Sequence, residues 1–83
     1  MTKRLHLAHF SVFRDARGRD AESVETHAET PRDLFDELFS SARGVAPSPQ
    51  TWARVAINDD LAAWDALLSD GDTVVFLAPS AGG

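Results

Sequence analysis

Apolar residues in the middle of the chain recur with the spacing of one helix face. Thr30 and Pro31 form a helix start, a capping hydroxyl followed by proline at the first helical position, and Gly44 is expected to end the helix. The apolar stripe between these signals consists of Leu34, Phe35, Leu38, Phe39 and Ala42. This pattern predicts one amphipathic helix whose stripe packs on a hydrophobic core.

Short apolar or alternating segments on both sides of the helix predict strands. They are residues 5–10, 19–27, 52–57, 61–64 and 74–77. The second is mostly polar and is expected at a sheet edge. The last is apolar at every position, which indicates a central strand buried on both faces and paired with the first strand. The order predicts an α+β fold, a mixed sheet of four to five strands with one main helix packed across it.

Turn signals separate these elements. Residues 10–18 are expected to form a short helical turn that Gly18 closes, residues 44–51 a loop, and Asp70-Gly71-Asp72 a tight turn. In the first strand, alternation places His6 and His9 on opposite faces, which argues against a metal ion shared between them. No metal site is predicted.

The negative charge is unevenly distributed along the 83 residues. The net charge is −5, yet the first 54 residues hold all eight Lys and Arg residues against eight of the 13 acidic residues. The excess lies beyond Arg54, in Asp59, Asp60, Asp65, Asp70 and Asp72. Such an end repels phosphate backbones, so no nucleic-acid partner is predicted. We expect the acidic last third to guide the C-terminal residues toward a basic pocket of a partner protein.

Composition limits the remaining classes of function. The chain has no cysteine, which excludes disulfides and thiol nucleophiles, and its 43% hydrophobic content is ordinary for a globular domain. No apolar run has the length of a membrane span, and histidines interrupt the apolar stretch near the N-terminus, so neither a membrane partner nor a signal peptide is predicted. A cytoplasmic location is expected.

Two motifs resemble one known family. Leu68-Ser69-Asp70-Gly71-Asp72 precedes the last apolar strand, and Pro79-Ser80-Ala81-Gly82-Gly83 follows it. This order resembles the small sulfur carriers of the ubiquitin-like β-grasp superfamily, above all the small subunit of molybdopterin synthase. Phe10-x-x-x-Arg14-Asp15-x-x-Gly18 is similar to the segment that follows the first strand in that family. Ala78 departs from the family pattern, which usually has a proline there.

The resemblance implies a division of the chain and a set of contact residues. Residues 1–77 would form the β-grasp domain, and residues 78–83 a flexible, extended Gly-Gly tail. The positions that match partner contacts in the family are Phe10, Arg14, Leu61 and Leu77. Burial in the domain's own core is the alternative for Phe10, Leu61 and Leu77, and a solvated helix charge is the alternative for Arg14.

The resemblance also implies the chemistry. A partner enzyme would use ATP to adenylate the carboxylate of Gly83, and a sulfur donor would convert it to a thiocarboxylate that serves the molybdopterin synthase large subunit. Gly82, Ala81, Ser80 and Pro79 would thread the tail into the partner. Residues without side chains suit a narrow channel. The chain would bind no cofactor and catalyse nothing by itself.

Three alternatives remain at this stage. The chain could carry sulfur for thiamin, cysteine or another sulfur-containing metabolite. It could modify other proteins through Gly83, as ubiquitin does. It could also be a β-grasp adaptor whose tail is inert.

Overall fold

The computed structural model describes residues 1–79. Five strands form one mixed sheet in the order β2-β1-β5-β3-β4, with β1 at Lys3–Ala8, β2 at Ala21–Thr26, β3 at Arg54–Ile57, β4 at Asp60–Ala62 and β5 at Thr73–Leu77. β1 pairs parallel with β5, and the other three pairings are antiparallel. The predicted pairing of the last strand with the first is therefore confirmed, and the second strand lies at an edge as expected.

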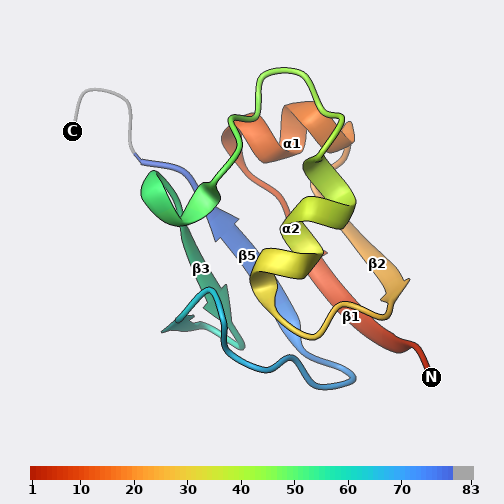
Figure 1. The fold of residues 1–83 in the computed structure, drawn as a ribbon. Helices are drawn as coiled ribbons and strands as arrows, with labels where there is room; N and C mark the ends of the chain where they lie inside the picture. The colour runs from red at the N-terminus through yellow and green to blue at the C-terminus, as the bar shows by residue number, and fades with distance from the viewer. Residues whose placement is uncertain (80–83) are drawn as a thin grey trace.

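Helix α2, Pro31–Phe39, lies across one face of the sheet, while α1, Ser11–Arg17, covers the end of the core where β1 leaves the sheet (Figure 1). The backbone N–H of Asp33 donates to the Thr30 hydroxyl, which confirms the predicted cap. Gly18 ends α1 with a left-handed backbone, as predicted. Gly44 does not end α2: the helix stops at Phe39, with Ser40 as its last, right-handed cap residue.

Aromatic rings fill the space between α2 and the sheet. Phe13 from α1 and Phe76 from β5 are almost fully buried and lie 5.8 Å apart between ring centroids. The rings of Phe35 and Phe39 on α2 contact both of them. The apolar stripe on α2 is thus core, as its spacing predicts.

The last strand is covered on one face only. Val74 and Phe76 are buried beneath α2, but Val75 and Leu77, which alternate with them, are half-buried. The expectation that this strand is buried on both faces is wrong, because both α-helices of residues 1–79 pack on the same side of the sheet. We call the side that carries Val75 and Leu77 the open face.

Two loops differ in detail from the sequence pattern. A short 3-10 helix, Pro49–Thr51, interrupts the expected loop, and Trp52 ends it, so β3 begins at Arg54 rather than at residue 52. Asn58 and Asp59 join β3 to β4 with positive φ at both positions, as in a tight hairpin turn.

Neither α-helix in the described part of the chain has the length and apolar character needed to cross a membrane.

Candidate functional site

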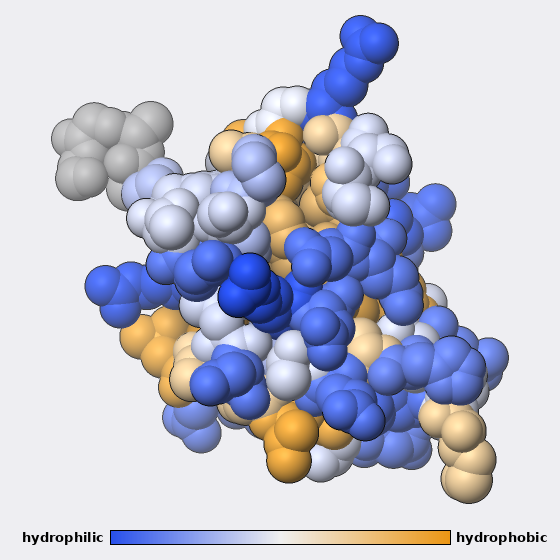
Figure 2. Space-filling model, viewed as in Figure 1, coloured by the Kyte–Doolittle hydropathy of each residue, from blue (hydrophilic) through white to orange (hydrophobic). Residues whose placement is uncertain are grey.

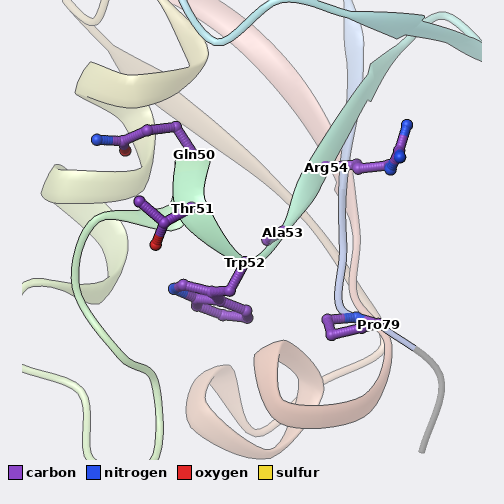
Figure 3. A pocket seen from close by; sticks show the side chains of 6 residues that line it. All are labelled: Gln50, Thr51, Trp52, Ala53, Arg54 and Pro79. Carbon is purple, nitrogen blue, oxygen red and sulfur yellow. The ribbon is translucent and has the colours of Figure 1, made fainter.

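The described part of the tail starts beside two hollows in the surface. β5 ends at Leu77, and Ala78 and Pro79 continue away from the sheet next to α1 and the 3-10 helix (Figure 1). One hollow, of about 440 Å³, is lined by Gln50, Thr51, Trp52, Ala53, Arg54 and Pro79 (Figure 3). The second, of about 330 Å³, is lined by Ser11, Val12, Gly44, Ala46, Trp52, Ala78 and Pro79. Pro79 and Trp52 therefore belong to the walls of both.

Trp52 is a fixed wall between these hollows. Its ring stacks on Phe13 with a centroid separation of 5.7 Å and an interplanar angle of 11°. Its indole N–H donates to the carbonyl of Pro47 over 3.1 Å. Because one side of the ring is held by the core and its edge by the loop, the indole is a rigid apolar surface next to the start of the tail.

The structure removes the alternative of core burial for two of the four predicted contact residues. Phe10 is 55% exposed and Leu61 is 63% exposed, far more than any core side chain of this domain. Leu77 is half-buried on the open face, and the side chain of Arg14 is 52% exposed. Contact with a partner stays a prediction for all four.

A row of apolar residues crosses the open face and includes Leu61. In the pairing register Ala8 lies opposite Val75, Val75 opposite Ala56, and Ala56 opposite Leu61. Residues directly opposite each other in neighbouring strands point to the same side of a sheet, so the row is continuous over four strands. Sequence reasoning did not single out Ala8, Ala56 or Val75. The sequence does contain a signal for this row, because residues that alternate along β3 and β5 point to opposite faces. The signal can be used only when it is known that the helices cover just one of these faces.

A buried ion cluster holds α1, which carries Arg14, against the sheet. Arg17 donates two hydrogen bonds to the Glu22 carboxylate, over 2.7 and 2.8 Å, and His9 Nε2 contacts the same carboxylate at 2.7 Å. The side chains of His9 and Glu22 are only 1% and 6% exposed. Arg17, with a smaller contribution from His9, lowers the pKa of Glu22 to about 2 despite its burial. The cluster thus joins His9, the residue after β1, to α1 and β2 at the end of the sheet where the tail starts.

The acidic residues of the last third do not accompany the tail in space. Asp70 and Asp72 precede β5, whereas the tail follows it, and Asp59 lies in the turn next to Asp72 because Asn58 hydrogen-bonds with the Asp72 carboxylate. These carboxylates also serve turns: Asp70 accepts from the backbone N–H of Arg4, and Asp72 from that of Ser69. The expectation that they guide the tail is wrong, because the length of β5 separates them from it.

The remaining predicted site residues, Ser80, Ala81, Gly82 and Gly83, lie outside the described residues. Within residues 1–79, no group of three or more His, Asp or Glu side chains is placed to hold a metal ion. On the side seen in Figure 1, hydrophilic side chains cover most of the surface, and hydrophobic ones show only in separate patches (Figure 2).

The family of the chain follows from the comparison with family models. The model of the ThiS family matches residues 10–83, which includes α1, all strands after the first, and the Gly-Gly end. The chain belongs to the ThiS family. It is therefore a small sulfur carrier of the ThiS and MoaD type, and the ubiquitin-like β-grasp predicted from its sequence is confirmed. No curated protein matched the sequence.

Solved structures of three proteins illustrate the range of this fold. A candidate molybdopterin converting factor, subunit 1, from Pyrococcus furiosus is 26% identical, with a TM-score of 0.71 over 94% of this chain and 99% of that one. The Amycolatopsis orientalis BexX/CysO complex contains a chain that is 25% identical, with a TM-score of 0.68 over 95% and 99%. The small archaeal modifier protein 1 from Methanosarcina acetivorans, at 17% identity, shares the fold with a TM-score of 0.75 over 100% and 99%.

Proposed function

We propose that this ThiS-family protein is the sulfur-carrying small subunit of molybdopterin synthase, with the carboxylate of Gly83 as the reactive group. The observation that carries the proposal is the order of four features along the chain: an Asp-Gly-Asp turn, the apolar strand β5, Pro79 and a Gly-Gly end. The family model matches the chain through residue 83. Similarity to the Pyrococcus furiosus protein at 26% identity supports the molybdopterin pathway.

The chemistry needs activation, because a carboxylate is ionised at neutral pH and is a poor electrophile. A partner enzyme joins the Gly83 carboxylate to the α-phosphate of ATP, and pyrophosphate leaves. A sulfide-level sulfur donor then attacks the acyl carbon, AMP leaves, and a thiocarboxylate remains. In the synthase, the thiocarboxylate sulfur forms a bond to a carbon of the pterin precursor as an oxygen substituent leaves that carbon. Water then cleaves the acyl–sulfur bond, which leaves the sulfur on the pterin and returns the Gly83 carboxylate. The partners supply the acid, base and cationic groups; this chain binds no cofactor and supplies the substrate end.

The carrier step has a direct test. Protein isolated from its native cell should show an intact mass raised by about 16 Da, the difference between sulfur and oxygen, located at Gly83. A variant with one extra residue after Gly83 is the matched control, because its fold is the same and its terminal glycine carboxylate is gone. Absence of the mass shift in the unmodified chain, under conditions where the pathway is active, would contradict the carrier assignment.

A carrier for another sulfur-containing product is the second candidate, and Ala78 is the observation that favours it, because the molybdopterin subunits usually have proline there. Purified thiocarboxylate protein, mixed with the large subunit and precursor Z, separates the two functions. Dithiolene product supports the molybdopterin role; a thiocarboxylate that forms but yields no product removes it. Modification of other proteins would instead give a ladder of heavier species on an immunoblot.

A further inference from the structure

Charge is separated along the length of the sheet in this protein. The end where β5 begins carries Asp59, Asp60, Asp70 and Asp72, as shown by the hydrogen bonds among these turns. The opposite end, where the tail starts, carries five arginines, Arg14, Arg17, Arg19, Arg43 and Arg54, against the three acidic residues Asp15, Asp20 and Glu22. Of these, Arg17 is committed to Glu22.

Arg54 lies at one side of the tail. It is the first residue of β3, directly opposite Leu77, and it lines the larger hollow together with Trp52 and Pro79 (Figure 3). Its side chain is exposed, and no acidic side chain in residues 1–79 pairs with it. By contrast, Arg4 at the far end is paired with Glu25 at 2.9 Å.

Arg14 and Arg43 lie near the other side of the tail. Arg14 is one helical turn from Ser11, which lines the smaller hollow, and its contacts to Asp15 and Asp20 are long, at 4.0 and 3.9 Å. Such long contacts between exposed groups hold a side chain weakly, so Arg14 remains available. Arg43 is exposed and precedes Gly44, another lining residue of that hollow.

We infer that the partner which receives the tail has an acidic rim around its channel, and that Arg54 on one side and Arg14 and Arg43 on the other bind this rim. The inference rests on the proposed function. The wall of Trp52, with Leu77 and Val12 nearby, gives the interface an apolar centre inside a charged border, the usual arrangement of specific interfaces. The aspartates lie at the opposite end of the sheet, so they do not compete with an acidic surface for these arginines.

The test compares two charge reversals with the same change in net charge. Arg54→Glu changes the tail end, whereas Arg32→Glu changes an exposed residue at the start of α2, near the far end. Association rates are measured by stopped flow with the purified ATP-dependent adenylating enzyme of the same genome. We expect Arg54→Glu to slow association about tenfold at low salt, and Arg32→Glu less than about twofold. The difference should shrink as salt rises, since salt screens exposed charges.

Equal effects of the two reversals, or faster association of Arg54→Glu, would overturn the inference. Arg54→Ala, with circular dichroism as a check of folding, separates loss of the charge from the new carboxylate. Chromatography on heparin is a second measurement. If Arg54→Glu is retained less than the wild type but associates with the enzyme at an unchanged rate, these arginines bind a polyanion rather than the enzyme, and the proposal is overturned. The mass shift at Gly83 tests the carrier function independently, so that result stands even if the acidic rim of the partner is refuted.

Discussion

Arg54 lies directly opposite Leu77 in the antiparallel pairing of β3 with β5. A cation and an apolar side chain thus share the open face one residue before the tail leaves the sheet. Arg54 also lines the larger hollow beside Pro79, so this residue belongs both to the open face and to that hollow. The pairing of β3 with β5 therefore fixes the position of both side chains next to the start of the tail.

Leu61 provides a prediction for the open face. Leu61→Ala should change the free energy of unfolding by no more than about 0.5 kcal/mol, because the side chain is 63% exposed. We expect it to weaken binding to the adenylating enzyme or the large subunit by about tenfold, as for an apolar contact at the centre of an interface. Leu67→Ala is the control, since Leu67 is 78% exposed and lies outside the strands. Isothermal titration calorimetry measures both, and equal losses of affinity would contradict the prediction.

Glu22 provides a prediction for the pH dependence of stability. Its pKa is lowered from 4.5 to about 2 in the fold, so the unfolded chain binds a proton at higher pH than the folded one does. The resulting stabilisation, about 3 kcal/mol, is complete above pH 4.5 and is lost as the pH falls toward 2. Urea unfolding between pH 6 and pH 2 should show this decline.

The matched variants for Glu22 are two glutamine substitutions. Glu22→Gln should be less stable at neutral pH and should show a smaller decline in acid. Glu25→Gln removes an equally charged but exposed carboxylate from the same strand and should retain most of the wild-type decline. A titration of the Glu22 side-chain carbon by NMR with a midpoint near 4.5 would contradict the assignment of the shift to Arg17 and His9.

The elements of the fold could be predicted because local signals and packing agree. The stripe on α2, the cap at Thr30 and the apolar β5 each specify one structure. The end of α2 could not be predicted from Gly44: a helix can stop wherever its residues no longer pack, and here this occurs after Phe39. Burial of β5 on both faces was the natural interpretation of four apolar residues, but one helix layer covers one face only.

The charge arrangement of the site could not be predicted from sequence order. Asp70 and Asp72 are close to the tail along the chain, yet β5 carries the chain about 17 Å between them at roughly 3.4 Å per residue. Arg54, more distant in sequence, is placed beside the tail by its pairing with Leu77. The motif matches predicted partner contacts for Phe10 and Leu61; the structure shows both to be exposed, and contact with a partner stays a prediction.

Gly18 provides a prediction for the placement of α1. Its φ is +73°, and no atom lies within 4 Å of the position that a Cβ would occupy, so the cost of a side chain is backbone strain alone. Gly18→Ala should lower the free energy of unfolding by about 1 kcal/mol. Gly18→Asn should lower it less, because asparagine tolerates the left-handed region. Urea denaturation compares them; an alanine variant as stable as the wild type would contradict this account of the helix end.

Trp52 and Trp64 make the docking of the tail end visible by fluorescence. Trp52 lines both hollows beside Pro79, whereas Trp64 stacks on Phe76 with a centroid separation of 5.6 Å and donates to the carbonyl of Ala53. A partner that covers the hollows removes water from the Trp52 indole, so the emission of Trp64→Phe should shift to the blue on binding. Trp52→Phe, which keeps only Trp64, should show little shift. With a partner whose own tryptophans are replaced or labelled, a larger shift in Trp52→Phe would place the contact elsewhere on the domain, away from the hollows and from Arg54.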